Sequence, residues 1–302
     1  MKSPFFSIII PTYNRAHLIS AAIESVVAQS FQNWELIIVD DGSTDNTHEV
    51  IAGFSATDNR VKYIYQKNAE RSAARNNGIR NALGEYVGFL DSDDAFAKDN
   101  LEQWHQFLAA HNFPKTFACC NYVLIDGSQR VPFVLPNAEV NRFLFIFKNP
   151  ITAPRMCIHR SLFQEFLFEE NMTIGEDVAL WLKMTQKHSL LSANHFGIEY
   201  YVHEGNTVNP KNPSALKMYE GFMRFFAKYP EIRKEIPDKD FNDYISKVQT
   251  NIAKYYYRNN KKFKAAFELT KAVWRCPFHE HTKYRLRLIF LTFISNNPNL
   301  YE

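Results

Sequence analysis

The stretch YVGFLDSDDAF, residues 86–96, places three carboxylates within four positions directly after an apolar run. Burying an unpaired carboxylate is costly, so a folded site needs positive charge beside this cluster. The simplest source is a divalent cation, because Mg²⁺ or Mn²⁺ takes oxygen ligands and shares them with phosphates. In an extended segment Asp91 and Asp93 point the same way, and we expect Asp94 to cap the following helix. The cluster predicts a metal site that receives a nucleoside diphosphate; a solvated turn is the competing interpretation.

A second acidic cluster, VDDGSTDNT, covers residues 39–47. Gly42 with the Ser and Thr that follow it is typical of a turn that caps the next helix. That explanation leaves Asp40 and Asp41, which are well placed to accept hydrogen bonds from a base or a ribose. Neither GxGxxG nor GxxxxGK[ST] occurs in the sequence, so a Rossmann dinucleotide fingerprint and a P-loop are not supported.

Short β-branched or aromatic runs alternate with segments of helical periodicity in the first third of the chain. The expected strands cover residues 6–10, 34–40, 61–66 and 86–91. Parallel strands need long right-handed crossovers, so this order predicts an α/β fold with a mostly parallel central sheet and helices on both faces. Each strand is followed by a polar cluster, which places all four clusters on the rim where such sheets bind ligands.

The rest of the chain divides near residue 210, where NPKNPS forms a breaker cluster. We expect residues 1–210 to form the α/β domain, with a mixed region from 116 to 201 covering the pocket, and residues 211–302 to be helical. The expected helices of that second part are Ser214–Lys228, Asp238–Arg258, Lys261–Arg275 and His279–Ile294. The second and third helices resemble an αα-hairpin with an Asn-Asn turn, which could also form an oligomer contact.

Composition indicates a compact globular protein, with 46% apolar and 15% aromatic residues. The formal charge of +3 is too small to imply nucleic acid, but from Lys211 onward 18 Lys and Arg stand against 9 Asp and Glu. Within this basic region, Lys283–Ile294 is basic and then strongly apolar. It is too short to span a bilayer, so it either lies on an anionic membrane surface or packs as a closing helix.

The compartment is predicted from two features. The four Cys are scattered without CxxC spacing, so neither a zinc site nor a disulfide framework is indicated. The apolar run at residues 5–10 is too short for a signal peptide, and no stretch of 18 apolar residues occurs. We therefore expect a cytoplasmic protein, with peripheral contact at the inner face of the membrane as an open alternative.

Five blocks together carry a family resemblance: SIIIPTYNR, LIIVDDGSTD, NAERSAARNNGI, GEYVGFLDSDD and GEDVALWLKM. Their order and rough spacing over the first 200 residues resemble the inverting family 2 glycosyltransferases of GT-A fold. The resemblance implies that Pro11 and Tyr13 hold the nucleobase and that Asp41 hydrogen-bonds it. It implies that Asp91 faces the ribose and that Asp93 binds the metal ion.

The same resemblance implies roles for the later blocks. Asp177 looks like the catalytic base, with helix capping as the alternative, and Glu176 contacts the acceptor. Arg75 lies near the nucleotide or pairs with a nearby carboxylate. His203 resembles a histidine that reaches the metal or the diphosphate.

The chain departs from the family pattern at three positions. Tyr201 and Asn206 stand where Arg and Ser are usual, and Glu70 replaces a frequent Gly. The loss of the Arg removes a cation that would grip the diphosphate, so the departures at Tyr201 and Asn206 put turnover in doubt.

The leading hypothesis is a metal-dependent, inverting glycosyltransferase of the hexosyltransferase type. It would move a sugar from a nucleotide diphosphate donor, a UDP-sugar first of all, to a hydroxyl of a glycan or lipid-linked acceptor in cell-surface polysaccharide synthesis. One alternative is a nucleotide-sugar-binding protein without turnover. Another is a sugar-phosphate nucleotidyltransferase, but the Gly-rich signature expected after the first strand is missing from PTYNRAHL.

Overall fold

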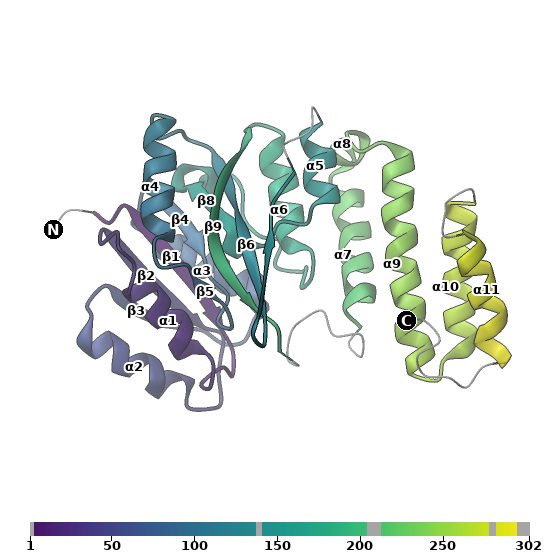
Figure 1. Cartoon of the computed structure of the whole chain (residues 1–302), viewed down its shortest axis with the longest axis horizontal. Helices are drawn as coiled ribbons and strands as arrows, with labels where there is room; N and C mark the ends of the chain where they lie inside the picture. The colour runs from purple at the N-terminus through teal and green to yellow at the C-terminus, as the bar shows by residue number, and fades with distance from the viewer. Residues whose placement is uncertain (1–2, 137–140, 204–212, 278–281, 295–302) are drawn as a thin grey trace. The chain divides into compact units, whose positions relative to one another are not determined.

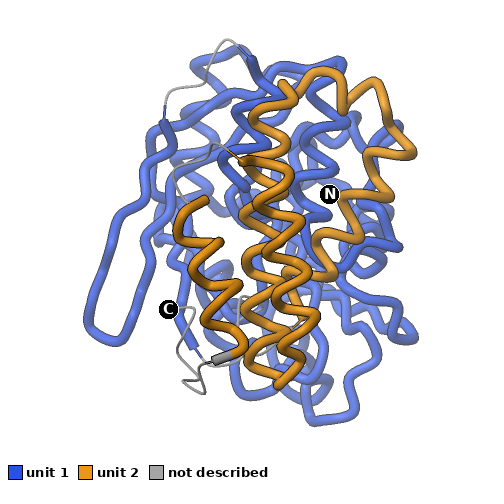
Figure 2. Tube along the Cα trace, turned by 90° about the vertical axis from the view of Figure 1, so that its right-hand side faces the viewer, with its two compact units in different colours: residues 1–203 blue, residues 204–302 orange. Residues whose placement is uncertain are grey.

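The computed structural model describes residues 3–136, 141–203, 213–277 and 282–294. The chain forms two compact units, Met1–His203 and Glu204–Glu302, which Figure 2 distinguishes by colour. The boundary predicted near residue 210 falls within 204–212, outside the described residues. No helix in the described part of the chain is long and apolar enough to cross a membrane.

The first unit is built on one mixed sheet (Figure 1). Within the described ranges its nine strands are β1 Phe6–Thr12, β2 Trp34–Asp40, β3 Val61–Tyr65, β4 Tyr86–Phe89, β5 Ala95–Phe96, β6 Phe117–Asp126, β7 Gln129–Phe133, β8 Met156–His159 and β9 Leu190–Tyr201. They are ordered β3-β2-β1-β4-β8-β6-β9-β5, with β7 paired to β6. The first four strands are parallel to one another, whereas β8 is antiparallel to β4 and β6.

The parallel half of the sheet confirms the predicted α/β fold. Its crossover helices are α1 Ile19–Val27, α2 Thr47–Thr57 and α3 Glu70–Asn81, and the later part of the unit adds α4 Asn100–Ala110, α5 Arg142–Lys148 and α6 Glu176–Thr185, with two 3₁₀ turns at Ala153–Arg155 and Arg160–Gln164. Successive residues of β1 face opposite sides. Ile8 and Ile10 pack in one cluster with the apolar face of α1, while Ile9 contacts Gly78 of α3. Helices therefore cover both faces of the sheet, as expected.

α3 carries Arg75, a candidate site residue, to the rim of the sheet. Gly78 sets the distance between this helix and β1. A Cβ at this position would lie 2.5 Å from Cγ2 of Ile9. Because Ile9 is fully buried, its side chain has no room to move away. The glycine thus lets the helix lie close against β1.

The second unit is helical: α7 Ser214–Lys228, α8 Pro230–Lys234, α9 Asp238–Arg258, α10 Lys262–Arg275 and α11 Thr282–Ile294. α7 and α9 have the predicted bounds, and α8 is a short helix that the sequence did not predict. Asn259 and Asn260 form the predicted turn between α9 and α10, with Asn260 at φ +57°. The predicted start of the last helix at residue 279 lies outside the described residues.

We predict that Gly78→Ala destabilises the protein by about 1–3 kcal/mol, because the added methyl overpacks the contact with Ile9. Gly53→Ala is the matched control, since Gly53 is an exposed residue of α2 with nothing within 4 Å of its added Cβ. There the change should stabilise by about 1 kcal/mol through helix propensity. Urea unfolding of the two variants measures the difference; equal effects at both glycines would contradict the close approach of α3.

Candidate active site

The loops after β1 and β2 are joined by hydrogen bonds on the carboxyl rim of the sheet. The backbone N–H of Asn14 donates to Oγ of Ser43 (2.9 Å), and the N–H of Thr44 donates to Oδ1 of Asn14 (2.7 Å). The backbone N–H of Asp41 donates to the carbonyl of Thr12 (2.8 Å). These two predicted clusters therefore share one rim and hold each other in place.

The two aspartates of the second cluster have different surroundings. Both carboxylate oxygens of Asp40 are engaged, by the N–H of Ser43 (2.8 Å) and the hydroxyl of Tyr63 (2.9 Å). Asp41 accepts two bonds at Oδ1, from the side chain of Gln66 (2.7 Å) and the N–H of Ala69 (2.9 Å). Its Oδ2 receives no hydrogen bond from the described residues, so Asp41 has a carboxylate oxygen open to a ligand, whereas each oxygen of Asp40 already has a partner.

Residues 91–94 form a turn rather than the extended segment that we expected, because the N–H of Asp94 donates to the carbonyl of Asp91 (3.1 Å). Asp91 and Asp93 consequently meet different partners. The capping role expected for Asp94 is wrong: it precedes β5, and its Oδ1 accepts from the N–H of Tyr201 (3.2 Å). Burial, and then the charges of Asp91 and Asp93, raises the pKa of Asp94 to about 9. Near neutral pH this carboxyl is therefore protonated.

Arg75 is the cation that draws the carboxylates together. Its side chain is 1% exposed, and its Nη1 lies 2.9 Å from Oε1 of Glu176 and 2.9 Å from Oδ1 of Asp177. Its Nη2 donates to Oδ1 of Asp91 (2.8 Å). Burial opposes the charge of the guanidinium, but the three carboxylates outweigh it and raise the pKa of Arg75. Arg75 therefore does pair with nearby carboxylates; its contact with a nucleotide stays a prediction.

The two acids of the GED block lie in the first turn of α6, where the helix dipole favours negative charge. Gly175 precedes them at φ +82°. Oδ2 of Asp177 accepts from the N–H of Ala153 (3.1 Å), which belongs to the preceding 3₁₀ turn and not to α6. Burial raises the pKa of Asp177, and burial with the charge of Asp177 raises the pKa of Glu176 to about 7. These shifts are typical of groups that exchange protons near neutral pH.

Asp93 and His203 are brought together although 110 positions separate them in the sequence. Nε2 of His203 lies 3.1 Å from Oδ2 of Asp93, and Nη2 of Arg15 lies 3.9 Å from the same oxygen. No group of three or more His, Cys, Asp or Glu side chains that could hold a metal ion is found in the described ranges. The carboxylate of Asp93 nonetheless fits Mg²⁺ or Mn²⁺, because such ions complete their shell with substrate phosphates and water. The imidazole of His203 fits Mn²⁺ rather than Mg²⁺, which takes oxygen ligands.

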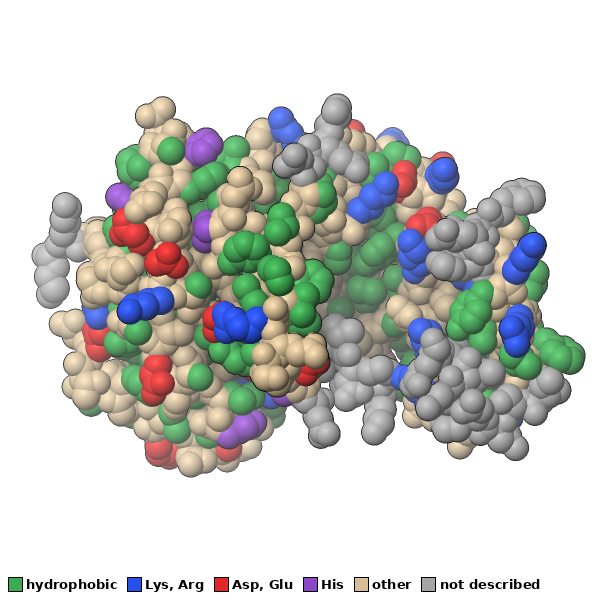
Figure 3. Space-filling view, in the orientation of Figure 1, with side chains coloured by type: hydrophobic (Ala, Val, Ile, Leu, Met, Phe, Trp, Pro, Cys, Tyr) green, Lys and Arg blue, Asp and Glu red, His purple; other side chains and the backbone are tan. Residues whose placement is uncertain are grey.

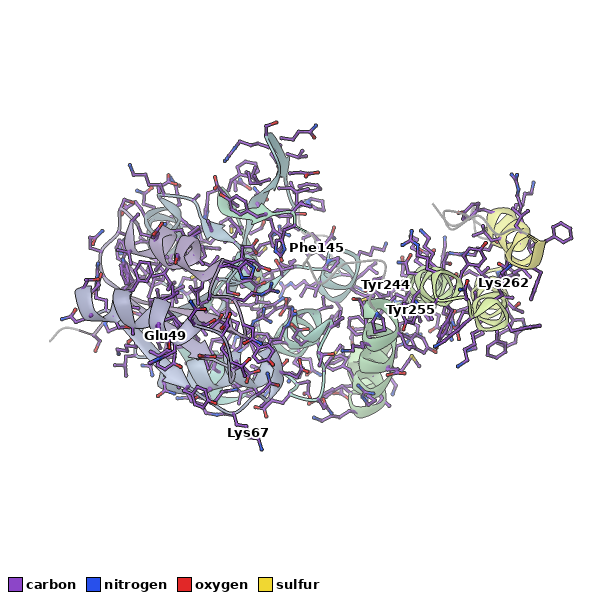
Figure 4. The ribbon with its side chains drawn as sticks, turned by 90° about the horizontal axis from the view of Figure 1, so that it is seen from below. Glu49, Lys67, Phe145, Tyr244, Tyr255 and Lys262 are labelled. Atoms are coloured by element: carbon purple, nitrogen blue, oxygen red, sulfur yellow. The ribbon has the colours of Figure 1, made fainter. Side chains whose placement is uncertain are left out.

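The nucleobase side of the rim is more open. Tyr13 is 47% exposed and Tyr65, at the end of β3, is 62% exposed. Lys67, in the loop after β3, points outward (Figure 4). Pro11 is half-buried in β1 and pairs with Val39 of β2. These positions match the predicted base-binding loop in location, and their contact with a base stays a prediction.

Our sequence reasoning missed two side chains that belong to this site. Arg15 puts a cation near Asp93, and its place in the block PTYNR was the available signal. Gln66 orients Asp41, and it stands in the polar cluster after the third strand. Tyr201 replaces the usual Arg and instead donates its hydroxyl to Glu199 (3.0 Å); Asn206 lies outside the described residues.

A parallel half-sheet with an acidic, loop-lined carboxyl rim defines the class of α/β proteins that bind nucleotides at that edge. Residues 7–171 match the profile of the glycosyl transferase family 2, and the chain belongs to this family. This membership removes the support for the nucleotidyltransferase alternative.

Relatives agree with the family. An uncharacterized glycosyltransferase of Rickettsia felis is 40% identical over 187 residues, which are 61% of this chain and 31% of that protein. The chain thus spans about a third of the length of this relative. The Escherichia coli enzyme UDP-Glc:alpha-D-GlcNAc-diphosphoundecaprenol beta-1,3-glucosyltransferase WfgD is 35% identical over 64% of this chain and 75% of its own length.

Solved structures support the fold. The structure of S. aureus TarS residues 1–349 in complex with UDP-GlcNAc superposes with a TM-score of 0.64 at 20% identity. The match covers 98% of this chain and 89% of that one. The predicted GT-A fold with a helical C-terminal region is confirmed.

We predict that Arg75→Met destabilises the protein by about 3–5 kcal/mol, because it leaves three partly buried carboxylates without their cation. Burial already raises the pKa values of Glu176 and Asp177, and without Arg75 these rise further above the unfolded values. The penalty is therefore present at high pH and shrinks as the pH falls and the carboxylates protonate. Urea unfolding at several pH values measures it. Arg80→Met, an exposed position on the same helix, is the control and should change stability by less than about 0.5 kcal/mol.

A second prediction concerns Glu70, which replaces the usual Gly and has φ +71° at the start of α3. The left-handed region strains any residue with a Cβ, so Glu70→Gly should stabilise by about 1 kcal/mol. Lys67→Gly, in the same loop but without a positive φ, should instead destabilise. Thermal unfolding compares the two; a loss of stability in Glu70→Gly would show that the acidic side chain outweighs the strain.

Proposed function

We propose that this protein is a metal-dependent, inverting glycosyltransferase that uses a UDP-sugar donor and a lipid-linked glycan acceptor. The observation that carries the proposal is the Arg75 cluster, in which one buried cation holds Asp91 and Asp177 together. By the family pattern the first faces the donor and the second removes the acceptor proton. The names of WfgD and of the TarS complex support a UDP-sugar, and that of WfgD supports a lipid-linked acceptor in cell-surface glycan synthesis.

The donor would lie along the rim. Oδ2 of Asp41 is available to accept a hydrogen bond from the base, with Pro11 and Tyr13 beside it. Asp93 and His203 would hold the divalent ion, which neutralises charge on the diphosphate leaving group when bound. Arg15 lies close enough to this pair to add a cation, which compensates for Tyr201 standing where an Arg is usual.

Asp177 would act as the general base. Its side chain is 16% exposed, whereas that of Glu176 is 4% exposed, so Asp177 is the acid of this pair that an acceptor hydroxyl can reach. Its bonds to Arg75 and to Ala153 fix its orientation, and its raised pKa strengthens it as a base. Glu176 would contact the acceptor.

Direct displacement follows from the same geometry. A double displacement needs a second carboxylate as the nucleophile besides the base, and no residue of the described site takes that role here: the side chain of Glu176 is only 4% exposed, and Asp91 would face the ribose. A single attack by the acceptor oxygen, with its proton passing to Asp177, inverts the anomeric centre. We assign this chemistry to residues 1–210 and an accessory role to residues 211–302.

We predict that Asp177→Asn lowers the rate of sugar transfer by about 10²–10⁴-fold, because an amide does not take up the proton that the acceptor hydroxyl loses. Binding of UDP in the presence of Mn²⁺ should be preserved. The assay is UDP release from UDP-sugars with a diphosphoundecaprenol-linked sugar, and calorimetry with UDP and MnCl₂ measures binding.

Asp93→Ala is the companion variant and should weaken binding of UDP in the presence of Mn²⁺. Full transfer by Asp177→Asn would sink the assignment of the base. A wild type that binds UDP but transfers no sugar from any donor would favour the binding protein without turnover.

A further inference from the structure

α10 carries a stripe of exposed aromatic side chains on one face. Phe263, Phe267 and Trp274 are 82%, 60% and 87% exposed. Their spacing of four and then seven residues returns to the same side of a helix. The opposite side is occupied, because Ala265 and Leu269 pack in a buried cluster with α9. The aromatic stripe is therefore a surface that the helix turns outward.

α11 carries a matching stripe. Leu286, Phe290 and Phe293 are four and then three residues apart, which also keeps them on one side of a helix. They are 52%, 67% and 45% exposed, while Leu288 packs inward with α9 and α10. The rings of Phe263 and Phe293 are 5.3 Å apart, so the two stripes meet. We call these six residues the aromatic face. Large side chains of this kind seldom gather on a protein surface without a partner.

Cations line the aromatic face. At 100° per residue, Lys264, Lys271 and Arg275 follow one side of the stripe on α10, and Lys283 and Arg287 follow the stripe on α11. Figure 3 shows blue and green side chains next to each other at the right-hand end, and Figure 4 labels Lys262 on α10. Within the described residues from 261 to 294 the acidic side chain is Glu268, which pairs with Lys271 (2.7 Å).

We propose that the aromatic face binds the surface of an anionic lipid bilayer. Aromatic and aliphatic side chains flanked by Lys and Arg suit the boundary between acyl chains and negative headgroups. Contact between two copies through this face would bring the Lys and Arg side chains of one copy opposite those of the other. Their repulsion disfavours such a dimer. The described helices are not membrane spans, so the contact is with the surface.

The proposed membrane contact rests on the proposed function, because a lipid-linked acceptor is what makes such a contact useful to the enzyme. A lipid-linked acceptor is confined to the membrane, so attachment of the enzyme to the same surface raises the effective concentration of enzyme and acceptor. The two interpretations of Lys283–Ile294 then hold for different sides of one helix, because Leu288 packs inward while Phe290 is exposed. The unexpected contribution comes from α10, whose aromatic residues face outward together with those of α11.

Trp274 provides a direct test. Of the four tryptophans in the chain, Trp34, Trp104 and Trp181 are at most 3% exposed, whereas Trp274 is 87% exposed. Addition of vesicles of phosphatidylglycerol and phosphatidylcholine should shift the fluorescence of the full chain to shorter wavelength. Co-sedimentation should show binding that weakens with salt. Trp274→Phe should still sediment with these vesicles but lose the spectral shift.

Two pairs of variants separate the apolar and the charged contributions. Phe263→Ser with Phe290→Ser should lower the partition onto anionic vesicles by about tenfold or more. Lys264→Glu with Arg287→Glu should lower it as well. Lys217→Glu with Lys234→Glu, exposed positions on α7 and α8, make the same charge change away from the aromatic face and should leave binding unchanged.

Three outcomes would overturn the proposal. The first is no binding of the wild type to anionic vesicles, and the second is equal binding to phosphatidylcholine alone. The third is a dimer in sedimentation velocity that Phe290→Ser dissociates, since the face would then join two copies. Calorimetry with UDP and MnCl₂ on the same samples reports on the nucleotide site independently, so failure of the membrane contact is distinguishable from failure of the proposed function.

Discussion

One buried guanidinium is the interaction on which the candidate site depends. Arg75 contacts three carboxylates from two separate segments, namely Asp91 after β4 and both Glu176 and Asp177 at the start of α6. Segments with this much negative charge would repel one another without it. Its burial makes the contribution large, because a buried charge that loses its partners is far more costly than an exposed one. The position of α3 against β1 is therefore also a condition for the site.

The acidic rim is neutralised by several different means. Asp91 is paired with Arg75, Asp94 is buried with its pKa raised to about 9, and Asp93 faces His203 and Arg15. In the proposed function Asp93 is therefore the member of the DSDD cluster that would bind a divalent ion. The proposed division of labour along this rim follows from these partners, with the donor toward Asp41 and the acceptor toward Asp177.

Local patterns were sufficient for most of the elements. The strand at residues 34–40 and the helices at 214–228 and 238–258 have the predicted bounds, because hydrophobic periodicity and breakers such as Pro230 and Pro237 act over neighbouring residues. Short elements were not predicted from such patterns. α8 is a single short helix. The turn at residues 91–94 depends on the hydrogen bond from the N–H of Asp94 to the carbonyl of Asp91, which hydrophobic periodicity does not predict.

By itself the sequence determined the alternation of strands and helices, the common rim and the candidate residues on it. The reason is that the spacing of residues along a strand or a helix determines the side of that element on which each side chain lies. Only the tertiary structure decided how those residues are paired. Arg75 and Asp177 are 102 positions apart, as Asp93 and His203 are 110 apart, and such contacts depend on how α3, α6 and β9 pack. The aromatic face is decided in the same way, since exposure of a Phe or Trp depends on which side of its helix the neighbouring helices cover.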